Sequence, residues 1–317
     1  MNTLAQWLLQ GDAYISYRVR LDLLGQEPDH PDVISDRKNM LEDPRIKGLI
    51  DILQDWPGMV VSNHKSAGLP HHILNFLVDI GVKIDDPGMH AVVDRIMDHI
   101  SRDGVIQSFI NIPRAFGGSG EGGWSWMLCD APLLLRGLFC LGLRDHPRIQ
   151  KAVDHLTGLV RDNGWPCSAA SELSKFRGPG SKDDACPYAT LIMVKLLAEI
   201  PGMMDNPLSR TGCESLLNSW EKREKKHAYL FYMGTDFCKL KAPLIWFDIL
   251  HVTKVLSRFP EIWKEARFQE MLKIIQNKAD EEGRYTPESI WTYWKDWEFG
   301  QKKVPSRWVT LLASTIS

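Results

Sequence analysis

The sequence contains no apolar run of the roughly eighteen residues that a bilayer-spanning helix needs. Its first residues lack the basic start and the long apolar stretch of a signal peptide. The six cysteines include no Cys-x-x-Cys pair, which argues against a disulfide framework and for a reducing compartment. Because the formal net charge is only -2, nucleic acid is not expected as the main partner. We therefore expect a cytoplasmic protein without an integral membrane segment.

Alternating strand-like runs are also scarce, whereas prolines divide a nearly unbroken helical pattern at regular intervals. One series of prolines precedes strongly apolar helical runs: Pro70, Pro132, Pro187, Pro243 and Pro305. A second series precedes more amphipathic runs: Pro44, Pro87, Pro147, Pro207 and Pro260. A repeat of roughly 55 to 60 residues with two helices is typical of stacked helical hairpins.

The repeat predicts an all-α fold of about six helical hairpins in a single domain, residues 1–317. Residues 12–24 form a divergent first inner helix in this interpretation, and the last outer helix is missing. The more apolar helix of each pair should face inward and the amphipathic one outward. Six hairpins can close into an α/α toroid or remain an open solenoid. We favour closure, because the inner helices are too uniformly apolar for a groove that is open to water.

Parallel inner helices would bring their proline-marked N-termini together at one end of the barrel. Helix N-termini offer free N–H groups and positive potential, which suit an anion such as a phosphate. The residues that flank these prolines are His71, His72, Cys129, Asp130, Asp184, Cys186, Lys239, Lys241, Ser306 and Arg307. They include His, Cys and Asp, the usual zinc ligands. The N-terminal mouth of the ring is therefore the expected place of the functional site.

A loop rich in glycine and basic residues leads into the helix expected to begin at Pro187. Its basic residues are Lys175, Arg177 and Lys182. Asp184 and Cys186 follow, close to the positive end of that helix. A carboxylate and a thiol in such a place are either metal ligands or a nucleophile with a lowered pKa. The simpler alternative is an acidic N-cap beside an ordinary buried cysteine.

Two short motifs resemble the zinc motifs of protein farnesyltransferase β subunits. Asp184-Ala185-Cys186 resembles their Asp-x-Cys motif, and Asp248-Ile249-Leu250-His251 resembles their Asp-x-x-His motif. The spacing of the two motifs is also close to that of the family. Asn163-Gly164-Trp165 and the glycine-rich segment 117–123 resemble features of the wider terpenoid cyclase and protein prenyltransferase superfamily. The layout as a whole resembles stand-alone bacterial prenyltransferase-like proteins.

This resemblance implies an enzyme that acts on an isoprenoid or similar apolar diphosphate in a central cavity, by transfer or ionisation. It implies a zinc ion held by Asp184, Cys186 and His251, with a fourth position for a substrate thiolate or water. The candidate catalytic residues are Asp184, Asp248 and Cys129. The candidate substrate-binding residues are Lys175, Arg177, Lys182, Tyr188, Trp124, Trp126 and His72. The oligomeric state is left open.

The sequence departs from the family pattern at several positions, so other functions remain possible alternatives. Cys129 stands where the transferases usually have a histidine, and Lys182-Asp183-Asp184 lacks the first Asp of the Asp-x-Asp-Asp motif of class II cyclases. Proton-initiated cyclisation is therefore not expected. Six-hairpin toroids also serve carbohydrate hydrolases, lyases and epimerases, for which Asp130 and Asp248 are the carboxylate pair to test. A non-catalytic binding or scaffold protein is a third alternative, because fold alone does not decide function.

Overall fold

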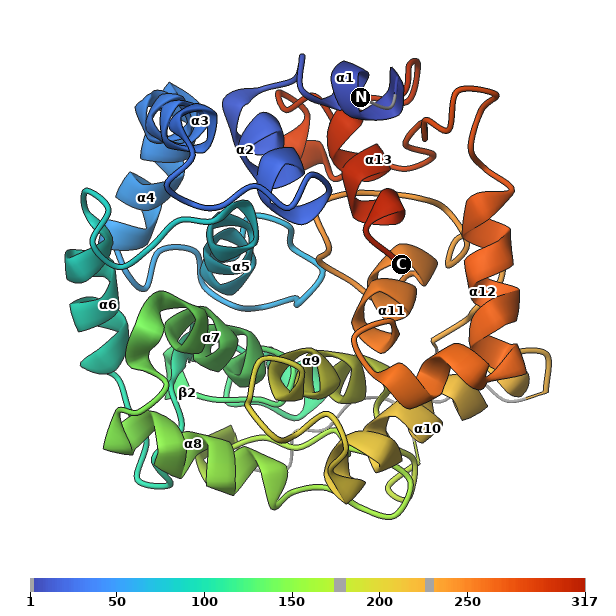
Figure 1. Cartoon of the computed structure of the whole chain (residues 1–317). Helices are drawn as coiled ribbons and strands as arrows, with labels where there is room; N and C mark the ends of the chain where they lie inside the picture. Colours follow the sequence, from blue (N-terminus) through green and yellow to red (C-terminus); the bar gives the residue numbers. More distant parts are fainter. Residues whose placement is uncertain (1–2, 174–180, 226–230, 317) are drawn as a thin grey trace.

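The computed structural model describes residues 3–173, 181–225 and 231–316. Six inner helices surround the centre of the molecule (Figure 1). They are α2 (Ala13–Asp22), α5 (Pro70–Ile80), α7 (Ala131–Leu138), α9 (Pro187–Leu197), α11 (Ile249–Leu256) and α13 (Arg307–Ser314). Each inner helix contacts the next one along the chain, and α13 contacts α2, so the ring is closed. The predicted α/α toroid is confirmed, and the open solenoid is excluded.

An outer layer of helices covers the ring (Figure 1). It consists of α3 (Pro31–Glu42), α4 (Pro44–Gln54), α6 (Met89–Met97), α8 (Pro147–Thr157), α10 (Pro207–Glu221) and α12 (Ala266–Gln276). The short helix α1 (Thr3–Leu8) contacts α2 and α13. Within the described residues no outer helix follows α13, in agreement with the sequence-based prediction.

Burial distinguishes the two layers as their sequences predict. All eleven residues of α9 are buried, because neighbouring helices enclose it. The outer helix α8 buries a single stripe of side chains: Ile149, Ala152, Val153 and Leu156. This three- and four-residue spacing is that of an amphipathic helix with one face on the core. In the described part of the chain, no helix combines the length and apolarity required to cross a membrane.

Proline and a side chain that accepts a hydrogen bond fix several helix starts. Asp43, His146 and Asn206 each accept a backbone N–H bond immediately before a proline in the first turn of α4, α8 and α10. Two prolines depart from the predicted pattern. The helix expected after Pro243 begins only at Ile249, because the Asp248 side chain caps it there. Pro260 opens a short 3₁₀ helix (Pro260–Lys264), and α12 starts after it, at Ala266.

The loops that precede the inner helices pair with one another. The only strands in the described ranges, β1 (Ser108–Ile110) and β2 (Gly123–Ser125), form an antiparallel pair. Single bridges join Val61 to Ile110 and Met127 to Ala169. Segments before α5, α7 and α9 are thereby linked at the N-terminal mouth of the ring.

Candidate functional site

Carboxylates of the chain itself occupy the N-terminal mouth of the ring, where the sequence predicted an anion site. Asp130 accepts two backbone N–H bonds at the start of α7, at 2.9 and 2.7 Å. Asp248 accepts one at the start of α11, at 3.0 Å, and Glu298 accepts two at the start of α13, at 3.0 and 2.7 Å. These bonds use N–H groups that a bound anion would need.

Four other side chains predicted to ring this mouth are buried. His71, His72, Lys241 and Ser306 are at most 6% exposed. Burial lowers the pKa of His72 to about 3, so its ring is neutral, and Nε2 lies 2.9 Å from the main-chain oxygen of His64. Among the described residues, these four side chains of the N-terminal mouth are therefore packed into the core and are not open to a ligand.

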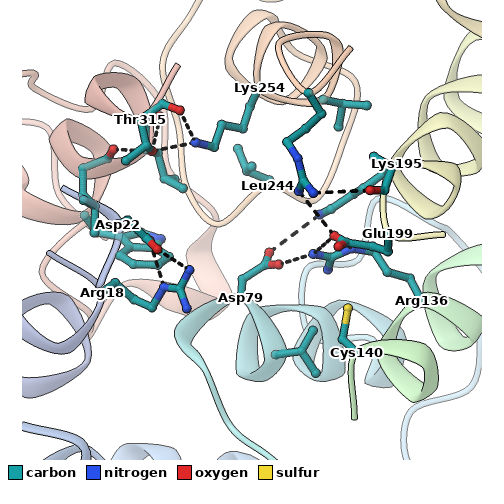
Figure 2. A pocket seen from close by; sticks show the side chains of 17 residues that line it. Arg18, Asp22, Asp79, Arg136, Cys140, Lys195, Glu199, Leu244, Lys254 and Thr315 are labelled. Carbon is teal, nitrogen blue, oxygen red and sulfur yellow. Dashed lines mark hydrogen bonds and ion pairs between the residues drawn. The ribbon is translucent and has the colours of Figure 1, made fainter. Parts of the chain in front are cut away.

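A pocket of about 480 Å³ opens at the C-terminal mouth instead (Figure 2). Every inner helix contributes to it through its last turn or the residues that follow. Its polar lining residues are Arg18, Asp22, Asp79, Arg136, Cys140, Lys195, Glu199, Lys254, Arg258 and Thr315. Its apolar lining residues are Val78, Ala198, Leu244, Val255, Trp308, Leu311 and Leu312. The volume lies within the range of small-molecule sites, and the lining is more polar than in most of them.

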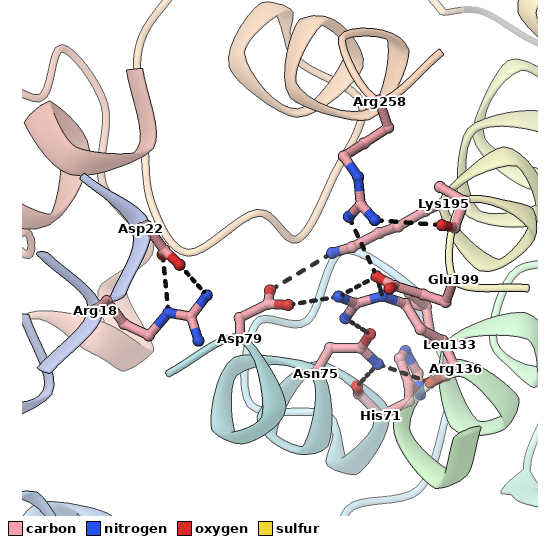
Figure 3. A network of polar contacts seen from close by, with 11 residues as sticks. Arg18, Asp22, His71, Asn75, Asp79, Leu133, Arg136, Lys195, Glu199 and Arg258 are labelled. Atoms are coloured by element: carbon pink, nitrogen blue, oxygen red, sulfur yellow. Dashed lines mark hydrogen bonds and ion pairs between the residues drawn. The ribbon is translucent and has the colours of Figure 1, made fainter. Parts of the chain in front are cut away.

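Arg136 is the centre of a charged network in this pocket (Figure 3). Its guanidinium donates to Asn75 Oδ1 at 3.0 Å and to Glu199 Oε1 at 3.0 and 3.2 Å. It also pairs with Asp79 Oδ1 at 2.8 Å. The Asn75 amide donates to main-chain oxygens on α5 and α7, both at 2.8 Å, which fixes the direction of its Oδ1. The network thus joins α5, α7 and α9 through buried polar bonds.

Lys195, in the last turn of α9, has an ammonium group without a hydrogen-bond partner in the described part of the chain. Its side chain is only 8% exposed, and Nζ lies 3.7 Å from Asp79 Oδ2, beyond hydrogen-bond distance. Burial lowers the pKa of Lys195, and the Asp79 carboxylate opposes this effect. A buried ammonium with unused N–H donors favours a ligand that accepts hydrogen bonds.

Lys254, on α11, also extends toward the pocket (Figure 2). Its Nζ donates to the main-chain oxygen of Thr315 at 2.8 Å and to the Thr315 hydroxyl at 2.5 Å. This contact stabilises the end of α13, where a cation complements the helix dipole. Since an ammonium has three N–H donors, one remains for a ligand. Burial lowers the pKa of Lys254 to about 8.

The charges of the lining residues favour an anionic ligand. Five lining side chains are lysine or arginine and three are carboxylates, and each carboxylate pairs with an arginine. Burial would raise the pKa of Asp79, but the charges of Arg136 and Lys195 outweigh burial and lower it. Asp79 is therefore ionised at neutral pH and is no proton donor. The pocket can bind negative charge, but its carboxylates are already paired.

The predicted zinc ligands do not come together. Asp184 lines a separate pocket formed mainly by α10. Cys186 is buried and stands immediately before the first turn of α9, without a side-chain capping bond. His251 donates through Nδ1 to the main-chain oxygen of Trp246 at 2.8 Å. No three His, Cys, Asp or Glu side chains of the described residues are grouped so that they could hold a metal ion. Zinc binding stays a sequence-based prediction.

Only part of the predicted basic loop belongs to the described residues. Lys175 and Arg177 lie outside the described residues. Lys182 is exposed, and its main-chain oxygen accepts a bond from the Arg161 side chain at 2.8 Å. The grip of this loop on a diphosphate therefore stays a prediction.

The predicted aromatic and histidine contacts lie outside the C-terminal pocket. Trp124 stacks on the His99 ring, and Trp126 packs edge-on against His155. Tyr188 is buried and donates to a main-chain oxygen at 2.8 Å. The catalytic candidates Asp184, Asp248 and Cys129 do not line that pocket either. A catalytic or binding role of these side chains stays a sequence-based prediction.

The residues that line the pocket were not predicted from the sequence, although a signal was present. Asp79, Arg136, Lys195 and Lys254 each place a charge in the last turn of an apolar inner helix. Burying a charge is costly unless the charge is paired or binds something. Charged residues at equivalent turns of four helices that form one ring therefore indicate a shared polar site.

No family model and no curated protein matches the chain. Among solved structures, the type II terpene cyclase MstE from Scytonema without ligand is similar with a TM-score of 0.43 and 12% identity, over 96% of this chain and 86% of that one. A variant of MstE in complex with its substrate geranylgeranyl dihydroxybenzoate gives 0.45 and 11%, over 96% and 84%. A protein from Actinoplanes gives 0.41 and 13%, over 96% and 88%. Similarity this low does not extend to ligand or reaction.

Proposed function

We propose that the protein is a terpenoid cyclase- or prenyltransferase-like enzyme that binds an isoprenoid diphosphate, or a similar apolar anion, in the C-terminal pocket. The observation that carries this proposal is the buried ammonium of Lys195, which makes no hydrogen bond within the described residues. An anionic head group would accept bonds from Lys195 and from the remaining N–H of Lys254. Charge-assisted bonds of this kind contribute roughly 1.5–3 kcal/mol each.

The apolar part of the lining suits the tail of such a ligand. Val78, Leu244 and Val255 come from three different segments, and Leu311, Leu312 and Trp308 come from α13. Burying a prenyl chain against these side chains stabilises the complex by roughly 25 cal/mol per Å² of apolar surface. A ligand with an anionic head and an apolar body therefore uses both parts of the pocket, whereas inorganic diphosphate uses only one.

The same cations suit a reaction that begins with ionisation. Breaking the bond between the prenyl carbon and the diphosphate oxygen leaves its electron pair on the diphosphate, and lysine and arginine stabilise that added charge. The Trp308 ring in the lining can stabilise the carbocation through its π face. Proton-initiated cyclisation fits less well, because Asp79 is ionised and paired with Arg136.

The carbohydrate alternative has less support. Glycoside hydrolysis needs two carboxyl groups that face one ligand. Asp130 and Asp248 are fully buried helix caps outside the pocket. Within the pocket, Asp79 and Glu199 share Arg136 as a partner. The test below therefore also includes results that would indicate a carbohydrate ligand or a purely structural role.

The test measures the melting temperature with farnesyl diphosphate, inorganic diphosphate, farnesol and a neutral disaccharide. Farnesyl diphosphate should raise it more than inorganic diphosphate or farnesol. Lys195→Met should weaken binding about ten- to a hundredfold, which corresponds to the loss of one charge-assisted bond. Lys273→Met is the matched control, because Lys273 is exposed on the outer helix α12. Release of inorganic diphosphate from the bound ligand tests for catalysis.

The variant Arg177→Ala with Lys182→Ala separates the pocket from the basic loop. If only this double variant loses the response, the anion binds at the loop and the assignment to the pocket fails. If the disaccharide alone raises the melting temperature, the carbohydrate function takes first place. If no ligand changes it, the proposal is refuted.

A further inference from the structure

Lys195 has a chemistry that goes beyond the binding of an anion. Its side chain lines the C-terminal pocket, is 8% exposed and lies in the last turn of α9. A lysine in such a place can hold an anion as an ammonium ion, or it can attack a carbonyl carbon as an amine. The surroundings of its Nζ favour the second role as well as the first.

The protein supplies too few hydrogen-bond acceptors for an ammonium group at this position. An ammonium carries three N–H donors, and within the described residues Nζ has no hydrogen-bond partner. One carboxylate lies near it: Asp79 Oδ2 is 3.7 Å from Nζ, while Asp79 Oδ1 pairs with Arg136 at 2.8 Å (Figure 3). A protonated imine keeps the positive charge of lysine but carries a single N–H. Attachment of a carbonyl compound therefore leaves one donor beside one acceptor.

The neighbours of Lys195 also favour the nucleophilic form of its nitrogen. Burial lowers the pKa of Lys195, and the charge of Arg136 acts in the same direction, whereas Asp79 opposes both. A larger share of this side chain is therefore the neutral amine than in an exposed lysine. Lys254 also lines the pocket, but its nitrogen is held by two bonds to Thr315.

The cations of the pocket call for a second group on the carbonyl compound. Lys254 keeps one N–H for a ligand, and Arg258 uses only part of its five N–H donors, in contacts with Ala198 and Glu199. Both cations line the same pocket as Lys195. A phosphate or carboxylate on the carbonyl compound would accept bonds from them and raise its local concentration at Lys195.

We propose that Lys195 forms an imine with an aldehyde that carries an anionic group. The lysine nitrogen adds to the carbonyl carbon, and the carbon–oxygen bond of the resulting carbinolamine then breaks. The oxygen leaves as water with two of the three ammonium protons, and the third proton stays on the imine nitrogen beside Asp79. No group is oxidised or reduced, and the positive charge is conserved. This step goes beyond the proposed function, which needs Lys195 only as a cation.

Pyridoxal phosphate is the probe, because it combines an aldehyde with a phosphate. The protein is incubated with a stoichiometric amount, the imine is reduced with borohydride to a stable secondary amine, and the labelled lysines are mapped by peptide mass spectrometry. Lys195 should be labelled about tenfold or more faster than Lys273, which is exposed on α12, because the pocket concentrates the anionic probe. Pyridoxal, which lacks the phosphate, should show a smaller preference for Lys195.

Lys195→Arg is the matched variant, because arginine keeps the positive charge and cannot form the imine under these conditions. It should lose the label that wild type carries on this peptide, whereas Lys273→Arg should keep it. The mapping of wild-type protein decides the proposal even if Lys195→Arg does not fold. Label on Lys254 in place of Lys195, or equal labelling of Lys195 and Lys273, would overturn the proposal.

Binding of farnesyl diphosphate to the untreated protein is measured separately, by the melting temperature. A response to farnesyl diphosphate without label on Lys195 would refute the imine alone. Label on Lys195 without any response to farnesyl diphosphate would refute the proposed function alone.

Discussion

Replacing Arg136 by methionine should cost more stability than any single surface change. The substitution removes three hydrogen bonds and leaves the carboxylates of Asp79 and Glu199 partly buried without their main partner. Breaking a buried pair on one side costs about 3–5 kcal/mol, because the other charge stays buried. Asn75 Oδ1 also loses its donor. We therefore expect the free energy of unfolding of Arg136→Met to fall by about 3–5 kcal/mol.

Urea denaturation followed by tryptophan fluorescence measures this change, and the twelve tryptophans give a strong signal. The control is Arg210→Met, which removes an exposed ion pair with Glu261 and should cost less than about 1 kcal/mol. Adding Asp79→Leu to Arg136→Met should restore only part of the loss, because it removes a buried carboxylate that has lost its arginine but also removes the ion pair of that carboxylate with Lys195. If Arg136→Met costs no more than Arg210→Met, the network does not hold the ring together and the reasoning is wrong.

Three further predictions follow from individual side chains. Burial raises the pKa of Asp248 from 3.8 to about 7, so the stability that its protonation confers is present below pH 4 and lost as the pH rises through about 7. The free energy of unfolding of Asp248→Asn, measured by urea titration, should therefore equal that of the wild type at pH 4. At pH 8 it should be higher by on the order of 4 kcal/mol, since each pH unit of pKa shift is worth about 1.4 kcal/mol. Parallel pH profiles of the two proteins would contradict this. Gly137→Ala should lower the free energy of unfolding by about 1–3 kcal/mol, because the added Cβ would lie 2.4 Å from a Leu74 methyl group. Gly48→Ala on α4 is the control. Its Cβ would have no heavy atom within 4 Å, so the same denaturation assay should find it neutral or stabilising. Calorimetric affinity for farnesyl diphosphate should fall above pH 8, since Lys254, with a pKa of about 8, loses its charge there, and a pH-independent affinity would exclude Lys254 from the site.

Most of the architecture was predictable because local sequence determines it. Prolines with polar caps begin α4, α8 and α10, and a uniform apolar composition identifies α9 as an inner helix. These signals act within one or two turns of a helix. The late start of α11 was harder to locate, because the cap at Asp248 prevails over the proline pattern.

The position of the C-terminal pocket was not predictable, since it depends on contacts between distant segments. Pairing of the segments before α7 and α9 links the loops at the N-terminal mouth, and buried carboxylates cap the helices there. The motif at Asp184 and Cys186 lies close together in sequence, but its two side chains have different surroundings in the fold. A short motif cannot specify which side of a loop each residue faces.

The central claim is that an anionic head group binds between Lys195 and Lys254. A crystal structure of the protein with farnesyl diphosphate, or with a non-hydrolysable analogue, tests it most directly. We predict diphosphate density within hydrogen-bond distance of Lys195 Nζ, with the prenyl chain against Leu311 and Trp308. Diphosphate density at the N-terminal mouth or at the basic loop, with no ligand in the C-terminal pocket, would contradict the claim.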